Sequence, residues 1–305
     1  MEDPKSSVEG LGINRNHRNR NRKEAFGMGY FNEEKAAAFA NRVRLDVAEI
    51  LERTRDSHIG GGYSAIDILS VLYTGVLNVT PETAEDPNRD IFILSKGHIA
   101  ASFYTVLAHK GFIRMEELKQ HVVDGSVYAG HTRKYQTRGV KGIEMSAGSL
   151  GHGANVGLGM AYAKRVQGLA GHVYVLMGDG ECNEGSVWEA MMFAAKLRLG
   201  NITFIVDRNR LQSYGSDVEV CNMGNLAGKF ESFGCEVIEI DGHNYAEIYR
   251  ALMTAHSRNQ AAPVVVVADT VKGKGVSFME NRLEWHFKSP NKEQLKMIRE
   301  ELGTK

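Results

Sequence analysis

The stretch 173-VYVLMGDG-180 decides the fold, because the apolar run 173–177 has strand length and ends in a Gly-Asp-Gly turn. Three more β-rich runs follow, at residues 202–207, 236–240 and 264–270. Helical patterns separate them, residues 184–197 and 245–256 among them. Short apolar strands that alternate with longer helices are typical of a parallel sheet. We therefore predict an α/β fold, with a parallel sheet that helices cover on both faces.

The chain before this stretch has two parts that differ in composition. Residues 14–23 read NRNHRNRNRK, which is basic, polar and without periodicity. We expect residues 1–28 to be a disordered tail, with a nucleic-acid or targeting role as the alternative. Further on, helical patterns cover residues 33–51, 63–77 and 100–109, and a short apolar run lies at 91–94. Because no internal repeat or proline-rich linker interrupts them, residues 29–305 are predicted to form one domain.

Composition excludes several classes of partner. The 305-residue chain has a formal net charge of zero and a pI of about 7.2, which argues against nucleic acid or an acidic membrane. Its three cysteines form no CxxC pair, so we expect no disulfide framework and a cytoplasmic location. No apolar run approaches the roughly 20 residues of a spanning helix. No signal peptide is recognisable at the start.

Polar groups follow two of the predicted strands where each one ends. Asp179 follows the strand 173–177, and Asn209 and Leu211 follow the strand 202–207. In an open parallel sheet, ligands bind at the carboxyl ends of the strands. A carboxylate, an amide oxygen and the Leu211 carbonyl suit a hard divalent ion such as Mg²⁺, which commonly also binds substrate phosphates. The alternative is structural, since Gly-Asp-Gly is a common turn and asparagine often caps a helix.

Four histidines lie in or beside turns, three of them next to glycine or one residue from it. They are His58, His98, His131 and His286. A single histidine is usually a packed or surface residue, but glycine-rich turns bring side chains close to ligands. Imidazoles hydrogen-bond phosphates and sugar hydroxyls, and they move protons near neutral pH.

Four motifs then resemble those of transketolase. They are 92-FILSKGH-98, 142-GIEMSAGSLG-151, 178-GDGECNEGSVWEA-190 and 272-KGKGVSFMEN-281. They follow the family's order, and the resemblance runs from about Glu33 to the C-terminus. It implies the thiamine-diphosphate-binding fold and the transfer of a two-carbon ketol unit from a ketose phosphate to an aldose phosphate.

The resemblance assigns the strand ends to the cofactor. Asp179, Asn209 and the Leu211 carbonyl look like ligands of Mg²⁺, or of another divalent cation such as Ca²⁺ or Mn²⁺. Gly178 and Gly180 look like contacts of the diphosphate, to which Asn209 also lies close. These roles are carried over from the family.

The histidines receive roles in the same way. His98 and His286 look like the residues that touch the cofactor diphosphate, and His286 also faces substrate. His58 and His131 resemble the family's histidines that contact sugar hydroxyls and assist proton transfer. The implied catalytic group is therefore His58, His131 and His286, together with Glu184.

Three further positions match the family pattern, and two short segments depart from it. Gly148 and Leu150 look like residues that pack on the cofactor, and Glu184 resembles the glutamate that couples paired active sites. Family members carry Gly-Gln-Gly where this chain has residues 151–153, and Pro-Gly commonly follows the histidine that matches His58. These departures affect the fine contacts.

The resemblance also implies a partner. A full transketolase has diphosphate-binding, pyrimidine-binding and C-terminal domains, and this chain matches the first. We expect a second chain to supply the other two in an α2β2 assembly, and we expect this chain to be inactive alone. The donor could instead be a sulfo-sugar or a branched-sugar phosphate of a specialised pathway. A non-catalytic cofactor-binding subunit is a further alternative, whereas a Rossmann oxidoreductase lacks its glycine fingerprint after the first strand.

Overall fold

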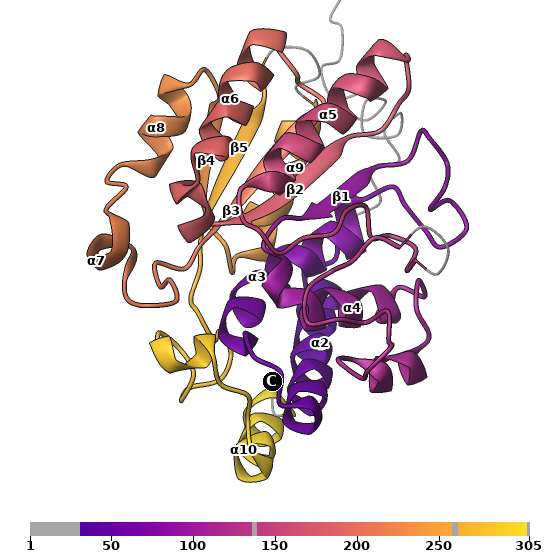
Figure 1. Cartoon of the computed structure of the whole chain (residues 1–305), viewed down its shortest axis with the longest axis vertical. Helices are drawn as coiled ribbons and strands as arrows, with labels where there is room; N and C mark the ends of the chain where they lie inside the picture. The colour runs from indigo at the N-terminus through magenta and orange to yellow at the C-terminus, as the bar shows by residue number, and fades with distance from the viewer. Residues whose placement is uncertain (1–30, 136–138, 258–261, 304–305) are drawn as a thin grey trace, which may run out of the picture. The chain divides into compact units, whose positions relative to one another are not determined.

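The computed structural model describes residues 31–135, 139–257 and 262–303. The chain divides into two units, Met1–Asn32 and Glu33–Lys305, and every element below belongs to the second. The tail predicted at residues 1–28 lies outside the described residues. Figure 1 shows a sheet with helices on both of its faces.

The sheet of the described residues has five parallel strands in the order β1-β2-β3-β5-β4. The strands are β1 (Ile91–Leu94), β2 (Val173–Gly178), β3 (Ile202–Arg208), β4 (Glu236–Asp241) and β5 (Val264–Asp269). The short apolar run at 91–94 thus becomes an edge strand. Four strands are almost wholly buried, as expected for a parallel sheet covered on both faces. The predicted fold class is confirmed.

One face of the sheet packs against α5 (His152–Val166), α6 (Gly185–Leu197) and α8 (Leu226–Ser232). Alternate strand residues point to this side, and Val175, Phe204 and Val265 are fully buried there. Removing such side chains from water contributes about 1.5–3 kcal/mol each. This layer fixes the strands whose ends carry the polar groups.

The opposite face carries α9 (Tyr245–Ser257), α3 (Ile59–Val71), α4 (Ala100–His109) and α2 (Glu33–Thr54). A single π turn, η1 (Leu72–Val76), continues α3. Every residue of α3 is buried, which is typical of a helix that is apolar all round. Helices α2 and α4 pack against it on the outside.

Helix α3 begins at Ile59, four residues before the predicted start at residue 63. Glycines 60–62 favour a turn by propensity, yet they are needed for close packing. A Cβ atom on Gly62 would lie 2.3 Å from Ser102 Oγ, and one on Gly60 would lie 3.0 Å from the Trp285 carbonyl oxygen. Close approach of the backbone therefore outweighs helix propensity here.

Six further helical elements lie in the described residues. They are η2 (Gly97–Ile99), η3 (Met115–Gln120), η4 (Gly180–Asn183), α7 (Asp217–Cys221), η5 (Leu283–His286) and α10 (Lys292–Gly303). Three of the 3₁₀ turns, η2, η4 and η5, carry or adjoin predicted site residues. Within the described part of the chain, no helix is both long and apolar enough to span a membrane.

Candidate functional site

The two strands whose ends were predicted to form the site are neighbours. Strand β2 pairs with β3 so that Gly178 lies opposite Asp207. The backbone N–H of Asp179 donates to the Asp207 carbonyl at 3.2 Å, which extends the pairing by one residue. The turns after both strands therefore meet at one place, as predicted from the parallel topology.

We call Asp179, Gly180, Asn209 and Leu211 the carboxyl edge. The Asp179 carboxylate accepts hydrogen bonds from the backbone N–H groups of Gly180 at 2.8 Å and Arg210 at 2.6 Å. The Asn209 side-chain oxygen accepts from the Leu211 N–H at 3.1 Å. Burial and the charge of nearby Asp207 raise the pKa of Asp179, while these backbone donors oppose the change. The turn thus concentrates oxygen atoms in a buried position.

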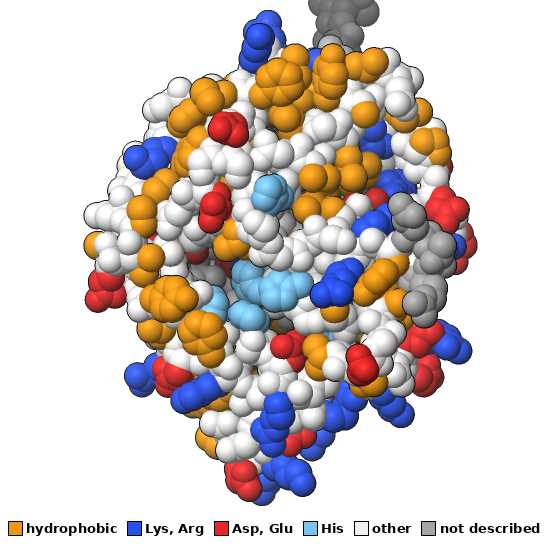
Figure 2. Space-filling model, viewed as in Figure 1, with side chains coloured by type: hydrophobic (Ala, Val, Ile, Leu, Met, Phe, Trp, Pro, Cys, Tyr) orange, Lys and Arg blue, Asp and Glu red, His pale blue; other side chains and the backbone are white. Residues whose placement is uncertain are grey.

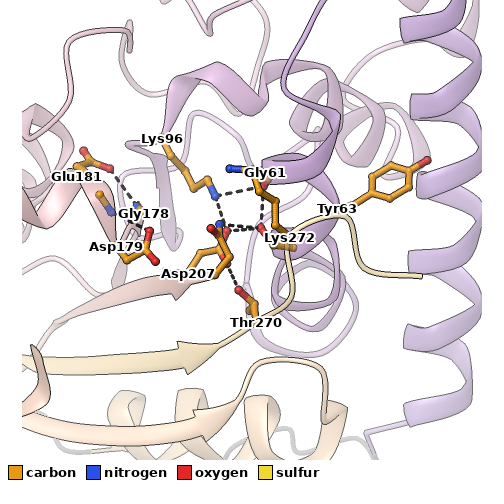
Figure 3. A network of polar contacts seen from close by, with 12 residues as sticks. Gly61, Tyr63, Lys96, Gly178, Asp179, Glu181, Asp207, Thr270 and Lys272 are labelled. Atoms are coloured by element: carbon orange, nitrogen blue, oxygen red, sulfur yellow. Dashed lines mark hydrogen bonds and ion pairs between the residues drawn. The ribbon is translucent and has the colours of Figure 1, made fainter. Parts of the chain in front are cut away.

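A buried ion pair lies beneath the carboxyl edge. The Lys96 ammonium contacts the Asp207 carboxylate and the Gly61 carbonyl, and Asp207 also accepts from Ser64 and Thr270. Figure 3 shows these contacts converging on Asp207. Burial alone would raise the pKa of Asp207, but Lys96 and the hydroxyl donors hold it below its ordinary value. We did not predict this pair from the sequence.

Lys272 connects the carboxyl edge to the histidines. Its ammonium donates to the Leu211 carbonyl at 2.8 Å and to His286 Nδ1 at 2.9 Å. Burial and the nearby charge of Lys96 lower the pKa of Lys272 to about 8. Lys272 opens a motif quoted above, yet its sequence position did not indicate that its side chain would be buried.

The four predicted histidines come together, and we call them the histidine group. The ring centroid of His58 lies 5.2 Å from that of His98, 6.1 Å from that of His131 and 5.2 Å from that of His286. The rings of His98 and His286 are stacked with centroids 6.0 Å apart. Figure 2 shows histidine side chains gathered near the middle of one face. These residues come from four separate segments of the chain.

Three members of the histidine group have lowered pKa values. Burial and the neighbouring positive charges lower the pKa of His58 to about 4 and that of His286 to about 3, and they hold that of His98 well below its ordinary value. These rings are therefore neutral near pH 7. Because Lys272 donates to His286 Nδ1, the proton of this ring lies on Nε2, which donates to Ser213 Oγ at 3.0 Å.

The remaining predicted residues lie in two places. A Cβ atom on Gly148 would be 4.0 Å from His131 Cδ2, so Gly148 borders the histidine group, and Leu150 is half-buried two residues later. Glu184 precedes α6 and is exposed, and its Cβ and Cγ lie beside Gly151. The structure thus places Glu184 at the start of α6 rather than among the histidine group.

A third buried carboxylate, Glu181, holds three segments together. It accepts hydrogen bonds from Ser95 Oγ, from the Gly151 N–H at 2.8 Å and from the Gly178 N–H at 3.2 Å. These partners come from the end of β1, the start of α5 and the end of β2. Sequence reasoning missed Glu181, although a charged residue inside a glycine-rich turn was an available signal.

The carboxyl edge offers oxygen ligands that suit a hard cation, and only one of them is a carboxylate. Among the described residues, no group of three or more His, Cys, Asp and Glu side chains is placed to hold a metal ion. The predicted set instead combines one carboxylate, one amide oxygen and one backbone carbonyl. Such oxygen donors fit Mg²⁺ bound together with a phosphate ligand. A Cβ atom on Gly178 would meet nothing within 4 Å, so the turn is open for approach.

Comparison with known proteins gives a consistent result. Residues 35–305 match the family described as transketolase, thiamine diphosphate binding domain. The chain is 39% identical over 254 residues to an apulose-4-phosphate transketolase subunit from Phocaeicola vulgatus, covering 83% of this chain and 88% of that protein. It is 36% identical over 247 residues to the 6-deoxy-6-sulfo-D-fructose transketolase subunit SqwG of Clostridium sp., covering 81% and 88%.

A solved structure extends the similarity to the whole fold. The transketolase of Campylobacter jejuni matches with a TM-score of 0.82 at 30% identity and covers 90% of this chain. The chain spans only 43% of the length of that protein. Similarity to subunit-sized relatives is thus nearly end to end, and similarity to this longer protein covers less than half of it.

Proposed function

This chain belongs to the transketolase family, and we propose that it is the thiamine-diphosphate-binding subunit of a two-chain transketolase. The observation that carries the proposal is the similarity to relatives that are named as subunits. The chain is 39% and 36% identical to two transketolase subunits, and 30% identical to a longer transketolase chain. The proposed reaction transfers a two-carbon ketol unit from a ketose phosphate to an aldose phosphate.

We assign the carboxyl edge to the metal and the diphosphate. Asp179, Asn209 and the Leu211 carbonyl would hold Mg²⁺ or a similar divalent cation, and Gly178 and Gly180 would contact the diphosphate. The buried oxygen atoms and the open turn support this assignment. When bound, thiamine diphosphate supplies the electron sink for the two-carbon fragment.

Two lysines, described above, add positive charge beside the carboxyl edge. Lys96 is neutralised by Asp207 in the buried pair, whereas Lys272 donates to two neutral partners, the Leu211 carbonyl and His286. Lys272 is therefore the cation placed to face a diphosphate group. His286 accepts a hydrogen bond from Lys272, and its ring is stacked with that of His98, so both histidines would hydrogen-bond the diphosphate.

We assign His58 and His131 to the sugar substrate, whose hydroxyl groups they would contact. His58 is neutral near pH 7, and its Nδ1 bonds Ser57 Oγ at 2.8 Å, which leaves Nε2 for a substrate hydroxyl. A neutral imidazole can accept a proton from a hydroxyl group and return it. Gly148 and Leu150 border this region and would pack against the cofactor.

The partner would contribute the rest of the active site. We propose an α2β2 assembly in the cytoplasm, in which Glu184 couples paired sites across an interface. Exposed apolar side chains in the later turns of α5 and α6, namely Tyr162, Val166, Met192 and Phe193, support a covered surface on the layer that Glu184 begins. In this family the glutamate that activates the cofactor lies in the pyrimidine-binding domain, so the partner would be essential.

The experiment that tests this proposal compares donor sugars. The two subunit relatives are named for apulose 4-phosphate and for 6-deoxy-6-sulfo-D-fructose, and their identities to this chain are similar. We therefore propose assaying the reconstituted complex of the two chains against a branched-sugar phosphate, a sulfo-sugar and xylulose 5-phosphate. Transfer from at least one donor is expected. Cofactor binding without transfer from any ketose would instead favour a non-catalytic cofactor-binding subunit.

A further inference from the structure

Asp56 lies in the turn between α2 and α3, two residues before His58. Its carboxylate accepts a hydrogen bond from His121 Nε2 at 2.9 Å. Burial would raise the pKa of Asp56, but the bonds from His121 and from the Ser57 backbone lower it. Asp56 is thus an ionised acceptor, and it links this turn to a distant part of the chain.

His121 is almost completely buried, with 1% of its surface exposed. Its ring packs edge-on to Tyr104, with centroids 6.0 Å apart. The other ring nitrogen, Nδ1, is buried and has no hydrogen-bond partner among the described residues. The bond to Asp56 is therefore the polar contact that orients this ring.

The segment that follows His121 leads to His131 and is strained at its start. Val122 adopts a left-handed backbone conformation with φ of 50°, which is unfavourable for a β-branched residue. Its N–H donates to the Tyr128 carbonyl at 2.8 Å and so closes the loop 122–128. Such strain persists only where the surroundings impose it. The loop ends three residues before His131.

The Asp56 turn is strained as well. Arg55 has φ of 58° and His58 has φ of 73°, both in the left-handed region. The carboxylate of Asp56 also lies against the backbone beside His131, because a Cβ atom on Gly130 would lie 3.2 Å from Asp56 Oδ2. Asp56 therefore contacts residues on both sides of the loop 122–128, and the second contact lies next to a histidine-group residue.

The segment just before the loop is anchored to α2. Arg53 donates to the carbonyls of Leu118 and Lys119, at 3.0 and 2.6 Å. The loop borders an open cavity of about 870 Å³, with Gln120, Asp124 and Tyr128 among its lining residues. Among the described residues, Asp56 contacts His121 and Gly130, and Tyr128 donates to Glu117 at 2.7 Å and packs against Tyr104.

We propose that Asp56 and His121 form a positioning pair that holds His131 against His58. The pair joins two strained segments, one carrying each histidine, and so sets the spacing of the two imidazoles. This inference rests on the proposed function, in which these imidazoles contact the sugar. Neither Asp56 nor His121 touches the sugar itself; both act through the backbone that carries the histidines.

Two substitutions at one position give a matched test. His121→Gln keeps an N–H donor near the position of Nε2, whereas His121→Asn places its donor nearer to Nδ1. In the reconstituted complex, we expect His121→Asn and Asp56→Ala to lower kcat/KM for the ketose donor roughly tenfold, because misplacement of about 1 Å is enough to lose the contact that His131 makes. His121→Gln should stay within a few-fold of the unmodified protein. The dissociation constant of thiamine diphosphate should be unchanged in all three.

A second His–Asp pair serves as the control. His109 Nε2 bonds Asp46 Oδ2 at 2.7 Å, between α4 and α2 and outside the histidine group. Asp46→Ala should leave kcat/KM unchanged. The double variant Asp56→Ala/His121→Asn should be no worse than either single variant, because the two residues act as one unit. Additive losses would contradict a shared role.

Hydrogen exchange of the full chain tests the positioning pair without activity. Asp56→Ala and His121→Asn should speed exchange of the Val122 amide, and His121→Gln should not. If the unmodified complex transfers no ketol unit, the proposed function fails, but this measurement still decides whether the residues hold the loop. Unchanged exchange would overturn the inference. Faster exchange with unchanged kcat and KM would show a purely structural bond and overturn it too.

Discussion

The carboxyl edge and the histidine group are built in opposite ways. The carboxyl edge comes from two adjacent strands, and pairing of Gly178 with Asp207 is enough to bring its parts together. The histidine group comes from four segments, and its rings meet only after those segments have packed. The edge is therefore fixed by sheet topology and the histidines by tertiary contacts. We expect substitutions in the two regions to affect different measurements.

The largest effect is expected from the buried pair beneath the carboxyl edge. Lys96→Met would leave Asp207 buried without its cation, since 1% of Lys96 and none of Asp207 is exposed. Breaking a buried pair in this way typically lowers the free energy of unfolding by about 3–5 kcal/mol. Urea denaturation of the full chain would measure the loss.

The control for this substitution is a surface pair. Lys296 lies 3.9 Å from Glu300 with both side chains mostly exposed. Lys296→Met should change the free energy of unfolding by less than about 0.5 kcal/mol. Similar losses for Lys96→Met and Lys296→Met would show that the edge does not depend on its buried pair.

The next effect concerns the cofactor. Asp179→Asn keeps the size of the side chain but removes the carboxylate of the proposed metal set. We expect the affinity for thiamine diphosphate in the presence of Mg²⁺ to fall about 100-fold, equivalent to about 2.7 kcal/mol. Calorimetry with and without Mg²⁺ would measure it. If the cofactor affinity of the variant depended on Mg²⁺ as it does in the unmodified protein, Asp179 would not be a metal ligand.

As the pH falls, the two regions should lose their contributions to the free energy of unfolding over different pH ranges. The folded pKa of His58 is about 4, whereas an unfolded histidine titrates near 6.5. The unfolded chain thus binds an extra proton below pH 6.5, and stability falls as the pH falls from there toward 4. Asp207 has a lowered pKa, so its contribution is retained until the pH falls below about 4.

His58→Asn tests this sign, because asparagine tolerates the left-handed backbone at this position. The unmodified chain should lose about 1–2 kcal/mol more than the variant between pH 7 and pH 5, after allowance for partial exposure. Urea denaturation at both pH values would measure the difference. Equal losses in both proteins would mean that His58 is not held neutral by burial.

The smallest effect is expected at His131. His131→Asn should lower kcat/KM for the ketose donor about tenfold, or about 1.4 kcal/mol, through loss of a sugar contact. The dissociation constant of thiamine diphosphate should stay within about twofold. Steady-state kinetics of the reconstituted complex and calorimetry would give the two values. A large loss of cofactor affinity would contradict the assignment of His131 to the sugar.

The same contrast explains what could be predicted from the sequence. Apolar runs of strand length predicted the parallel sheet, and parallel strand ends predicted that Asp179 and Asn209 would lie close together. The four histidines were singled out by their positions in or beside turns, and the structure brings all four together. Their roles, like those of the carboxyl edge, stay predictions.

Buried polar contacts could not be predicted in this way. Lys96 and Asp207 are far apart in the sequence, and no local pattern shows that a lysine will pair with a strand-end aspartate inside the fold. Glycines 60–62 favoured a turn by propensity, but close backbone packing made them helical. The Asp56–His121 bond likewise joins two segments that no periodicity relates.

One measurement tests the central claim most directly. The purified chain is assayed for ketol transfer alone and after mixing with a chain that carries pyrimidine-binding and C-terminal transketolase domains, both with thiamine diphosphate and Mg²⁺. We predict no turnover by the chain alone and donor-dependent turnover by the mixture. Full turnover by the chain alone would contradict the proposal that it is one subunit of a two-chain enzyme.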